Sequence, residues 1–249
     1  VYGHLQYVVD IHVVELYFQR VCFEAYFQSE EEIKKSPRQM RELAPGDIKY
    51  KDLNDDGVID ANDQCYLGKS WFPSWSYGMG FNINYHNFDL ALFFQGVSDV
   101  SIMANGGSID TGNGDWGASG VGIVPFTGMG LNPSNVITKA LDRWTADNPR
   151  ADAWYPRMTA NATTNDNNYV NSTHWLKDGS YLRLKQASLG YTLENKKLMD
   201  KGIEYLYFYL SGQNLLTFSK FKLWDPELGS NGAKYPLSRM VTLGMRVSF

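Results

Sequence analysis

Apolar and polar residues alternate with a period of two along several long segments of the chain. The clearest is the last segment, 240–249 (MVTLGMRVSF), where every second residue from Val241 to Phe249 is apolar and the residues between them are small or polar. Successive side chains of a strand point to opposite faces, so this pattern predicts a strand over 239–249 with one apolar and one wet face. A final aromatic residue on such a strand is typical of outer-membrane barrels.

Five further segments repeat that alternation and are predicted to be strands. In 75–85 (WSYGMGFNINY) the apolar face is large and aromatic at both ends, which is typical of a lipid-facing band between aromatic girdles. A two-residue turn is expected at 86–87, with Asn87 tolerating the positive φ. The alternation changes phase near Lys185–Gln186, which predicts a β-bulge. The other predicted strands are 4–14, 88–96, 180–193 and 204–218.

Short and long connections alternate between these strands. Residues 86–87 and 194–203 are short, whereas 28–74, 97–179 and 220–238 are long and rich in Gly, Asn, Asp and Pro. Bacterial outer-membrane barrels have this layout, with short turns on the periplasmic side and long loops outside. Counting back from a final strand that ends in the periplasm, we expect the long connections to be extracellular.

One segment within the longest connection has helical signals. Residues 134–149 (SNVITKALDRWTADNP) begin with a Ser cap, space their apolar residues as a helix does, and end at a Pro. A short loop helix is predicted there. The predicted fold class is therefore all-β: the antiparallel C-terminal portion of a large transmembrane β-barrel, with long extracellular loops and a short loop helix. The recognised strands are too few for closure, because small membrane barrels need at least ~8.

The stretch 52–63 (DLNDDGVIDAND) has the spacing of a calcium-binding loop. Gly57 stands where such a loop turns sharply, and calcium takes roughly six to eight hard oxygen ligands. We predict a structural calcium ion in the extracellular segment 45–70, of modest affinity because the last ligand is Asp rather than Glu. A solvated turn rich in Asn and Asp is the alternative. The expected ligands are Asp52, Asn54, Asp56, the Val58 carbonyl, Asp60 and Asp63.

Composition and charge exclude some classes of partner. The chain has 249 residues, of which 43% are hydrophobic and 14% aromatic, enough for one or two ordinary domains and suited to long strands. Its net charge is −4 and no basic cluster is visible, so nucleic acid is not an expected partner. No apolar run is long enough for a transmembrane helix. Cys22 and Cys65 allow at most one intramolecular disulfide and identify no compartment.

Residue types used in catalysis are present but form no recognisable site. No spacing pairs two of the loop carboxylates, and the four histidines form no metal-ligand motif. We therefore predict that the chain is not an enzyme. Loop tryptophans suit stacking on sugar rings or packing within the loops, and packing is favoured for any single one. These residues are Asp110, Asp115, Asp147 and Asp152; His4, His12, His86 and His174; and Trp116, Trp154, Trp175 and Trp224.

Several longer motifs follow one another in a fixed order. They are FQSEEEI (27–33), PGDIKYKDLNDDGVIDANDQ (45–64), YLGKSWFPSWSYGMGFNINYHNFDLALFFQGV (66–97), RWTADNP (143–149), YPRMT (155–159), DGSYLRLKQASLGYTL (178–193), YFYLSGQNLLTFSKFKLWDPE (207–227) and YPLSRMVTLGMRVSF (235–249). Through these motifs the chain resembles the C-terminal part of the SusC/RagA family of TonB-linked outer-membrane proteins. Residues 1–26 depart from the family's pattern, which usually has a Gly-rich segment there.

The resemblance implies a gated importer of oligosaccharides or peptides in the outer membrane of a Gram-negative bacterium, driven through TonB. The implied partners are a SusD-like lipoprotein lid, TonB acting through regions outside this chain, the barrel assembly machinery and outer-membrane lipid. We recognise no TonB box, plug domain or leader in 1–249. The whole chain is therefore expected to be one partial barrel, about the last quarter of a transporter of ~22 strands.

The chief alternative is a secreted carbohydrate-binding β-sandwich stabilised by calcium. It shares the alternation, the aromatic residues and the acidic loop. The unequal loops and the terminal Phe249 argue against it. The sequence leaves open the transported substrate, the calcium affinity, the oligomeric state and the pairing of Cys22 with Cys65.

Overall fold

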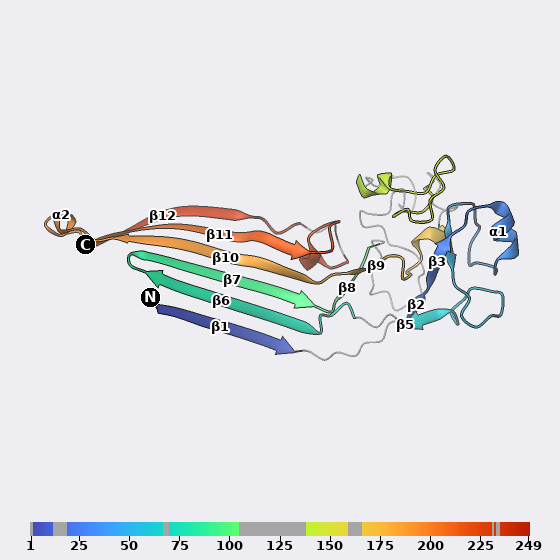
Figure 1. Cartoon of the computed structure of the whole chain (residues 1–249), viewed down its shortest axis with the longest axis horizontal. Helices are drawn as coiled ribbons and strands as arrows, with labels where there is room; N and C mark the ends of the chain where they lie inside the picture. The colour runs from blue at the N-terminus through green and yellow to red at the C-terminus, as the bar shows by residue number, and fades with distance from the viewer. Residues whose placement is uncertain are drawn as a thin grey trace.

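The computed structural model of the chain contains one large antiparallel sheet with an assembly of loops at one end (Figure 1). The structure describes residues 2–11, 19–66, 70–104, 138–158, 166–230, 232 and 235–249. The sheet has six strands in the order β1-β6-β7-β10-β11-β12. Their bounds are Tyr2–Ile11 (β1), Trp75–Tyr85 (β6), Phe88–Ser98 (β7), Tyr181–Leu193 (β10), Tyr205–Ser219 (β11) and Met240–Ser248 (β12). All the strands predicted from the alternation are present, although 12–14 of the first one lie outside the described residues.

The sheet is open, with β1 and β12 as its two edges. Both chain termini lie at the end of the sheet away from the loop assembly, as does the short helix α2, Lys196–Met199 (Figure 1). The predicted short connections, 86–87 and 194–203, are at that same end, and the long ones are at the other. The described strands thus separate the two kinds of connection, as the sequence pattern predicts.

The turn between β6 and β7 differs from the expectation in one detail. The residue with positive φ is His86, at 52°, and not Asn87. The Asn87 side chain instead donates from Nδ2 to the Thr192 carbonyl at 2.8 Å, and the Thr192 amide donates to the Asn87 carbonyl at 2.8 Å. Asn87 is therefore used to tie the hairpin to β10, and His86 takes the left-handed position.

The predicted bulge is confirmed in the middle of β10. The pairing of β10 with β7 and with β11 shifts register between Leu184 and Gln186. Relative to β7, Lys185 is the extra residue of β10, because Leu184 and Gln186 pair with the consecutive residues Phe94 and Phe93. On β11 the same irregularity includes Asn214, whose φ is 53°. Bulges of this kind bend a strand and increase its twist.

Cross-strand pairing gives the sheet two unlike faces. One face, which we call the outer face, is apolar and exposed. The other, the inner face, carries mostly small, polar or tyrosine side chains, with Phe93, Val97 and Met240 as apolar exceptions. Exposed outer-face residues are Trp75, Phe81, Ile83, Tyr85, Phe88, Leu189, Phe208, Leu210, Leu216, Phe218, Val241, Leu243 and Met245. The sheet therefore exposes a continuous apolar surface that a water-soluble sheet would cover.

On the inner face a glycine allows a contact across three strands. Tyr207 on β11 donates its hydroxyl to the Asp89 carboxylate on β7 at 3.0 Å. Gly190 on β10 lies between them, and a Cβ at that position would collide with both groups. The Arg246 guanidinium on β12 lies 6.0 Å from the Tyr207 ring centroid.

The loop assembly, which we call the loop head, comprises the described residues of 19–66, 100–104, 138–158, 166–178 and 220–230. It contains three two-stranded sheets, β2 with β5, β3 with β4 and β8 with β9. Their strands are Gln19–Val21 (β2), Phe23–Tyr26 (β3), Ile48–Tyr50 (β4), Gln64–Tyr66 (β5), Ser101–Met103 (β8) and Leu176–Asp178 (β9). Its helical segments are α1 (Glu30–Lys35), η1 (Thr138–Leu141), η3 (Asp166–Tyr169) and η4 (Pro226–Leu228).

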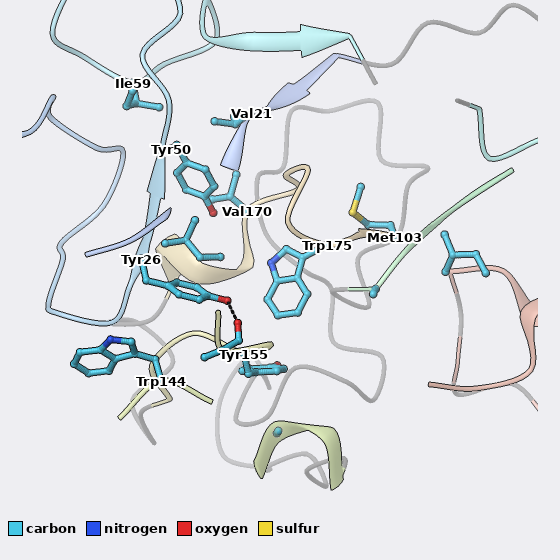
Figure 2. Packing of buried hydrophobic residues seen from close by; sticks show 14 of the residues in the cluster. Val21, Tyr26, Tyr50, Ile59, Met103, Trp144, Tyr155, Val170 and Trp175 are labelled. Carbon is cyan, nitrogen blue, oxygen red and sulfur yellow. Dashed lines mark hydrogen bonds between the residues drawn. The ribbon is translucent and has the colours of Figure 1, made fainter. Parts of the chain in front are cut away.

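The hydrophobic core of the described residues lies in the loop head and not against the sheet. Side chains from segments far apart in sequence pack together there, as Figure 2 shows for Tyr26, Tyr50, Tyr155 and Trp175. Gly46 contributes by its lack of a side chain: its φ is +90°, and a Cβ would collide with the Trp144 ring. The other cluster members include Val21, Ile48, Ile59, Ile102, Met103, Trp144, Val170 and Phe221.

The short loop helix predicted within 134–149 is present, as a 3-10 helix that is shorter than the segment. Its first residues, 134–137, lie outside the described residues, and the described part contains only the four-residue 3-10 helix η1. Trp144 is buried in the core and its amide donates to the Tyr155 carbonyl at 2.9 Å, so tertiary contacts replace the continuing helix. No helix among the described residues is long and apolar enough to cross a membrane.

Candidate functional site

The acidic loop, residues 52–63, connects β4 to β5 at the outer end of the loop head. Two of its residues adopt the left-handed conformation, Asp55 at φ 59° and Gly57 at φ 82°. The Asp52 carboxylate accepts from the amides of Asp55 at 2.7 Å and Gly57 at 2.8 Å. These contacts close the sharp turn that Gly57 was predicted to make.

Asp63 closes the other end of the acidic loop. It is fully buried, and its two carboxylate oxygens accept from the amides of Leu53 and Asp60, each at 2.8 Å. A buried carboxylate needs such hydrogen-bond donors. By accepting from both amides, Asp63 holds the start of the loop, at Leu53, close to its last turn, at Asp60. Asp60 accepts in turn from the Asn62 amide at 2.7 Å.

The expected calcium ligands are hard oxygen donors, and their chemistry fits calcium. In the structure these oxygens accept bonds from the loop itself: Asn54 Oδ1 from the Asp56 amide at 3.0 Å and Asp56 Oδ1 from the Val58 amide at 2.8 Å. Each carboxylate oxygen keeps a second lone pair that a cation can use. Within the described residues, no three His, Cys, Asp or Glu side chains come together so as to hold a metal. Calcium at this loop therefore stays a prediction.

The acidic loop is attached to the core by its backbone. The Arg38 amide donates to the Gly57 carbonyl at 2.9 Å, and the Ile59 amide donates to the Arg38 carbonyl at 2.8 Å. Ile59 is a member of the buried cluster. A disulfide joins Cys22 to Cys65, with their Cα atoms 6.0 Å apart. These contacts hold the acidic loop in one position on the head.

A buried ion pair joins distant segments of the head. Asp47 is fully buried, and Arg157 donates to its two oxygens from Nε and Nη2, both at 2.9 Å. Asn168 Nδ2 donates to the same carboxylate at 2.8 Å, and the Ala44 amide donates at 2.8 Å. Four donors satisfy a charge that would otherwise be costly to bury. The bidentate geometry joins segments separated by 110 residues.

The aromatic residues of the head pack on one another. Trp175 is fully buried and donates its Nε1 hydrogen to the Asn168 carbonyl at 2.8 Å. The His174 ring lies 4.6 Å from Trp175, and burial followed by the nearby Lys177 charge lowers the pKa of His174 to about 3. Trp154 and Trp224 are half-buried, and Trp224 donates to the Gly229 carbonyl at 2.7 Å. The packing role favoured for the loop tryptophans is confirmed for Trp175; Trp116 lies outside the described residues.

Burial also changes the acidity of other groups in the head. The pKa values of Tyr26 and Tyr50 are raised, first by burial, which disfavours the phenolate. Burial lowers the pKa of Lys177, whose Nζ donates to the His174 carbonyl at 2.7 Å. The hydrogen bond from Lys139 holds the pKa of Asp142 below its usual value. Tyr26 and Tyr50 belong to the buried cluster, whereas Asp142 is partly exposed and pairs with Lys139 and Arg150.

A charged network ties η4 to the inner face of β10. Arg183 is 1% exposed and pairs with Asp225, while its Nη1 lies 3.8 Å from a Glu227 oxygen. Glu227 also accepts from Lys185 at 3.0 Å and from the Tyr181 hydroxyl at 2.9 Å. The segment carrying Asp225 and Glu227 is therefore held across the wet face of the sheet at the end nearest the head.

The residues considered for catalysis are not brought together where the structure describes them. Asp147 is exposed, and Asp152 is exposed with its carboxylate 3.9 Å from Arg150. His174 is half-buried among aromatic rings, and His86 is exposed in the β6–β7 turn. Asp110, Asp115 and His12 lie outside the described residues, as does the side chain of His4.

Several organising contacts have only a weak signal in the sequence. Asp47 lies in the PGDIKY motif and Arg157 in YPRMT, so each is visible as part of a motif and their pairing is not. Arg183, Asp225 and Glu227 likewise lie in two separate motifs. The pairing of Cys22 with Cys65 is settled by the structure.

Comparisons with known proteins are consistent with this architecture. No protein-family model matches the chain. It is 30% identical over 248 residues to the TonB-dependent receptor P26 of Formosa agariphila, covering 93% of this chain and 22% of that protein. It is 28% identical over 221 residues to the TonB-dependent receptor P3 of the same organism, covering 82% of this chain and 19% of that protein. The chain thus spans about a fifth of the length of these relatives.

Solved structures share the fold. The RagAB peptide transporter aligns with a TM-score of 0.60 at 22% identity, covering 94% of this chain and 22% of that one. The RagAB peptide importer in its open-open state aligns with a TM-score of 0.57 at 22% identity, over 93% of this chain and 22% of that one. An open antiparallel sheet, as found here, fits a part of such a barrel. Together with the ordered motifs, these matches show that the chain belongs to the SusC/RagA-type TonB-dependent receptors.

Proposed function

We propose that the chain forms part of the barrel wall and an external head of a TonB-dependent importer of nutrients. The observation that carries this proposal is the sheet with one apolar, exposed face and one wet face. A soluble carbohydrate-binding sandwich is not favoured, because it needs two large packed sheets, and the other sheets of the described residues have two strands each.

The dimensions of the sheet suit a bilayer. β6 and β7 have 11 residues each, which at ~3.3 Å per residue gives a strand about 36 Å long. A tilt of about 40° leaves about 28 Å along the membrane normal, enough for an apolar band of ~25 Å. Leu243 is 80% exposed at the centre of the outer face of β12. Lipid is the partner that makes such exposure favourable.

The layout of connections supports an orientation. Short connections lie at the end of the sheet with the termini, and the loop head lies at the other end (Figure 1). In outer-membrane barrels the long loops are outside. This layout supports an orientation with the loop head on the cell surface and the β6–β7 turn in the periplasm.

The cargo class is an oligosaccharide or a peptide. RagAB is described as a peptide transporter, and the shared fold is the support for a peptide. Sugar stacking on the half-buried tryptophans of the head would support an oligosaccharide, but these residues are equally suited to packing. The partners of the whole receptor would be a SusD-like lipoprotein over the head, TonB acting from the periplasm, and the barrel assembly machinery. Catalysis forms no part of the proposal.

Calcium is proposed as a structural ion of the acidic loop. Its support is the ligand spacing and the left-handed turn at Asp55 and Gly57. Asp52, Asn54, Asp56, the Val58 carbonyl, Asp60 and Asp63 would hold it. The ion would offset repulsion between the loop carboxylates and fix the loop on the cell surface, where calcium is available at millimolar levels.

The wall is tested by two arginine substitutions on adjacent residues of β12 in the full-length receptor. Leu243→Arg places a charge on the outer face and is expected to cost up to ~2–4 kcal/mol, which lowers the amount of receptor in the outer membrane. Thr242→Arg places the same charge on the wet inner face and is expected to leave that amount near wild type. Immunoblots of purified outer membranes measure both. Equal levels of the two variants would contradict the proposed wall.

A further inference from the structure

The Cys22–Cys65 disulfide closes a ring within the loop head. The two residues are separated by 43 positions in sequence. The ring encloses β3, α1, β4 and the acidic loop. Cys22 lies between β2 and β3, and Cys65 is the middle residue of β5. The disulfide thus lies beside the short β2–β5 sheet.

Both ends of the acidic loop are fixed to Cys22. At its start, the Lys51 amide donates to the Cys22 carbonyl at 2.9 Å. At its end, Cys65 follows Asp63 by two residues and is bonded to the Cys22 sulfur. The supporting β2–β5 sheet has three residue pairs, Gln19 with Tyr66, Arg20 with Cys65 and Val21 with Gln64. A two-stranded sheet of this size is not stable alone in water.

The rest of the ring is held independently of the disulfide. Tyr26 donates its hydroxyl to the Ala153 carbonyl at 3.0 Å, and Tyr50 donates to the Asn167 carbonyl at 2.5 Å. Asp47 holds Arg157 through two bonds. These contacts join the ring to parts of the head outside it, and none uses a sulfur atom. Loss of the disulfide would therefore act on the β2–β5 sheet and the acidic loop.

We propose that the Cys22–Cys65 disulfide is a redox clasp for the acidic loop. The bond fixes the C-terminal end of residues 52–63 to Cys22, whose carbonyl accepts from Lys51 at their N-terminal end, and its reduction by a dithiol releases that loop while the six-stranded sheet and the remaining head stay folded. The inference rests on the proposed function in one respect: export through an oxidising periplasm is what supplies the bond.

The clasp forms by thiol–disulfide exchange with an oxidised dithiol oxidoreductase of the periplasm. One cysteine thiolate attacks the disulfide of that protein and forms a mixed disulfide. The second cysteine then attacks the receptor sulfur and releases the oxidoreductase as its dithiol. Two electrons pass from the two thiols to the oxidoreductase, and their two protons end on its thiols. Both cysteines are half-buried, so the exchange precedes complete packing of the head.

The test uses the full-length receptor in outer-membrane vesicles, in EDTA so that no cation holds the loop. A serine protease that cuts after acidic residues needs no metal and has five sites in 52–63, and peptide mass spectrometry reports cleavage there. Dithiothreitol is expected to speed that cleavage by about tenfold or more, since cutting follows the opened population of the loop. The Cys22→Ser/Cys65→Ser variant should be cut at the fast rate with or without the reductant.

Two further readouts make the outcome decisive. A maleimide reagent should label Cys22 and Cys65 only after reduction, and the mobility of the unheated barrel on a gel should not change. Thiols that label before reduction, loop cleavage unchanged by reduction, or loss of the folded barrel on reduction would each overturn the clasp. The proposed import function is tested separately, by measuring uptake of labelled glycan or peptide through the oxidised receptor, and absent uptake would contradict it. The loop cleavage result does not depend on any cargo.

Discussion

The six-stranded sheet and the loop head place the same kinds of side chain in opposite surroundings. On the sheet, Leu243 on β12 is 80% exposed and Trp75 on β6 is 45% exposed. In the head, Trp175 and Ile48 are fully buried. The sheet has regular pairing and no second layer among the described residues, whereas the head has short irregular elements around a core. The difference is the one that the proposed membrane setting requires: apolar groups face outward where lipid would surround them and inward where water does.

The largest expected effect is a difference in the stability of the head between two tryptophan substitutions, one in each region. Trp175→Ala removes a buried ring from the centre of the core and should destabilise the head by about 3–5 kcal/mol. Trp75→Ala removes an exposed outer-face ring and should leave the head unchanged. Thermal melting of the full-length receptor, followed by protease cleavage within the head, measures both. A head that melts normally without Trp175 would refute the assignment of the core.

The next effect concerns the buried charge of the head. Asp47→Ala leaves Arg157 without its carboxylate, and because the Arg157 side chain keeps 24% exposure the cost should be about 2–4 kcal/mol rather than the larger value for a fully buried ion. Asp152→Ala, at a carboxylate that is 83% exposed, is the control and should change stability by less than about 0.5 kcal/mol. Chemical denaturation with proteolysis of the head as the readout compares them. Equal stability of the two variants would contradict the structural role of the pair.

A smaller, pH-dependent effect is expected from His174. Burial lowers the pKa of His174 from 6.5 to about 3 in the folded head, so the unfolded chain binds the proton more readily. The stability that the neutral ring provides is complete above about pH 6.5 and is lost as pH falls toward the folded pKa. The head should lose on the order of 2 kcal/mol by about pH 5.

The control for that profile is a second histidine. His174→Phe keeps an aromatic ring in the cluster and should flatten the pH dependence of head melting between about pH 6.5 and 4. His86→Gln, in the exposed β6–β7 turn, should keep the wild-type profile. If the Phe variant keeps the same acid sensitivity, the carboxylates of the head are responsible and not His174.

How much was predictable from sequence differs between the two regions for a physical reason. The sheet strands follow a local rule, because alternation between lipid and water repeats every second residue, and even the bulge at Lys185 changes the phase visibly. The turn was located correctly, although His86 takes the positive φ in place of Asn87. Local pattern therefore specifies nearly all of the sheet.

The head follows no such rule. Its core joins Tyr26, Tyr50, Tyr155 and Trp175, which come from separate loops, and its strands have three or four residues. Such short segments have no measurable period. Within the described residues the predicted loop helix extends only over η1, because Trp144 packs into this core. The acidic loop was located from spacing alone, since Asn, Asp and Gly at fixed positions favour one turn with or without an ion.

The smallest expected effect tests whether that loop needs an ion, and it uses two adjacent aspartates. Asp56 is a predicted ligand, whereas Asp55 adopts φ 59° at a position that the ligand spacing omits. Calcium at millimolar concentration should stabilise the acidic loop by about 1 kcal/mol, as expected when the ion is a few times above its dissociation constant. Asp56→Asn should abolish that gain and Asp55→Asn should keep it, although both remove one negative charge. Cleavage within 52–63 in EGTA and in calcium measures the gain for each receptor. If calcium protects neither the wild type nor the Asp55 variant, the hydrogen bonds that Asp52 and Asp63 accept from the backbone hold the loop without an ion. If calcium protects the wild type and both variants equally, screening of the carboxylates explains the effect, and the predicted ligand set is wrong.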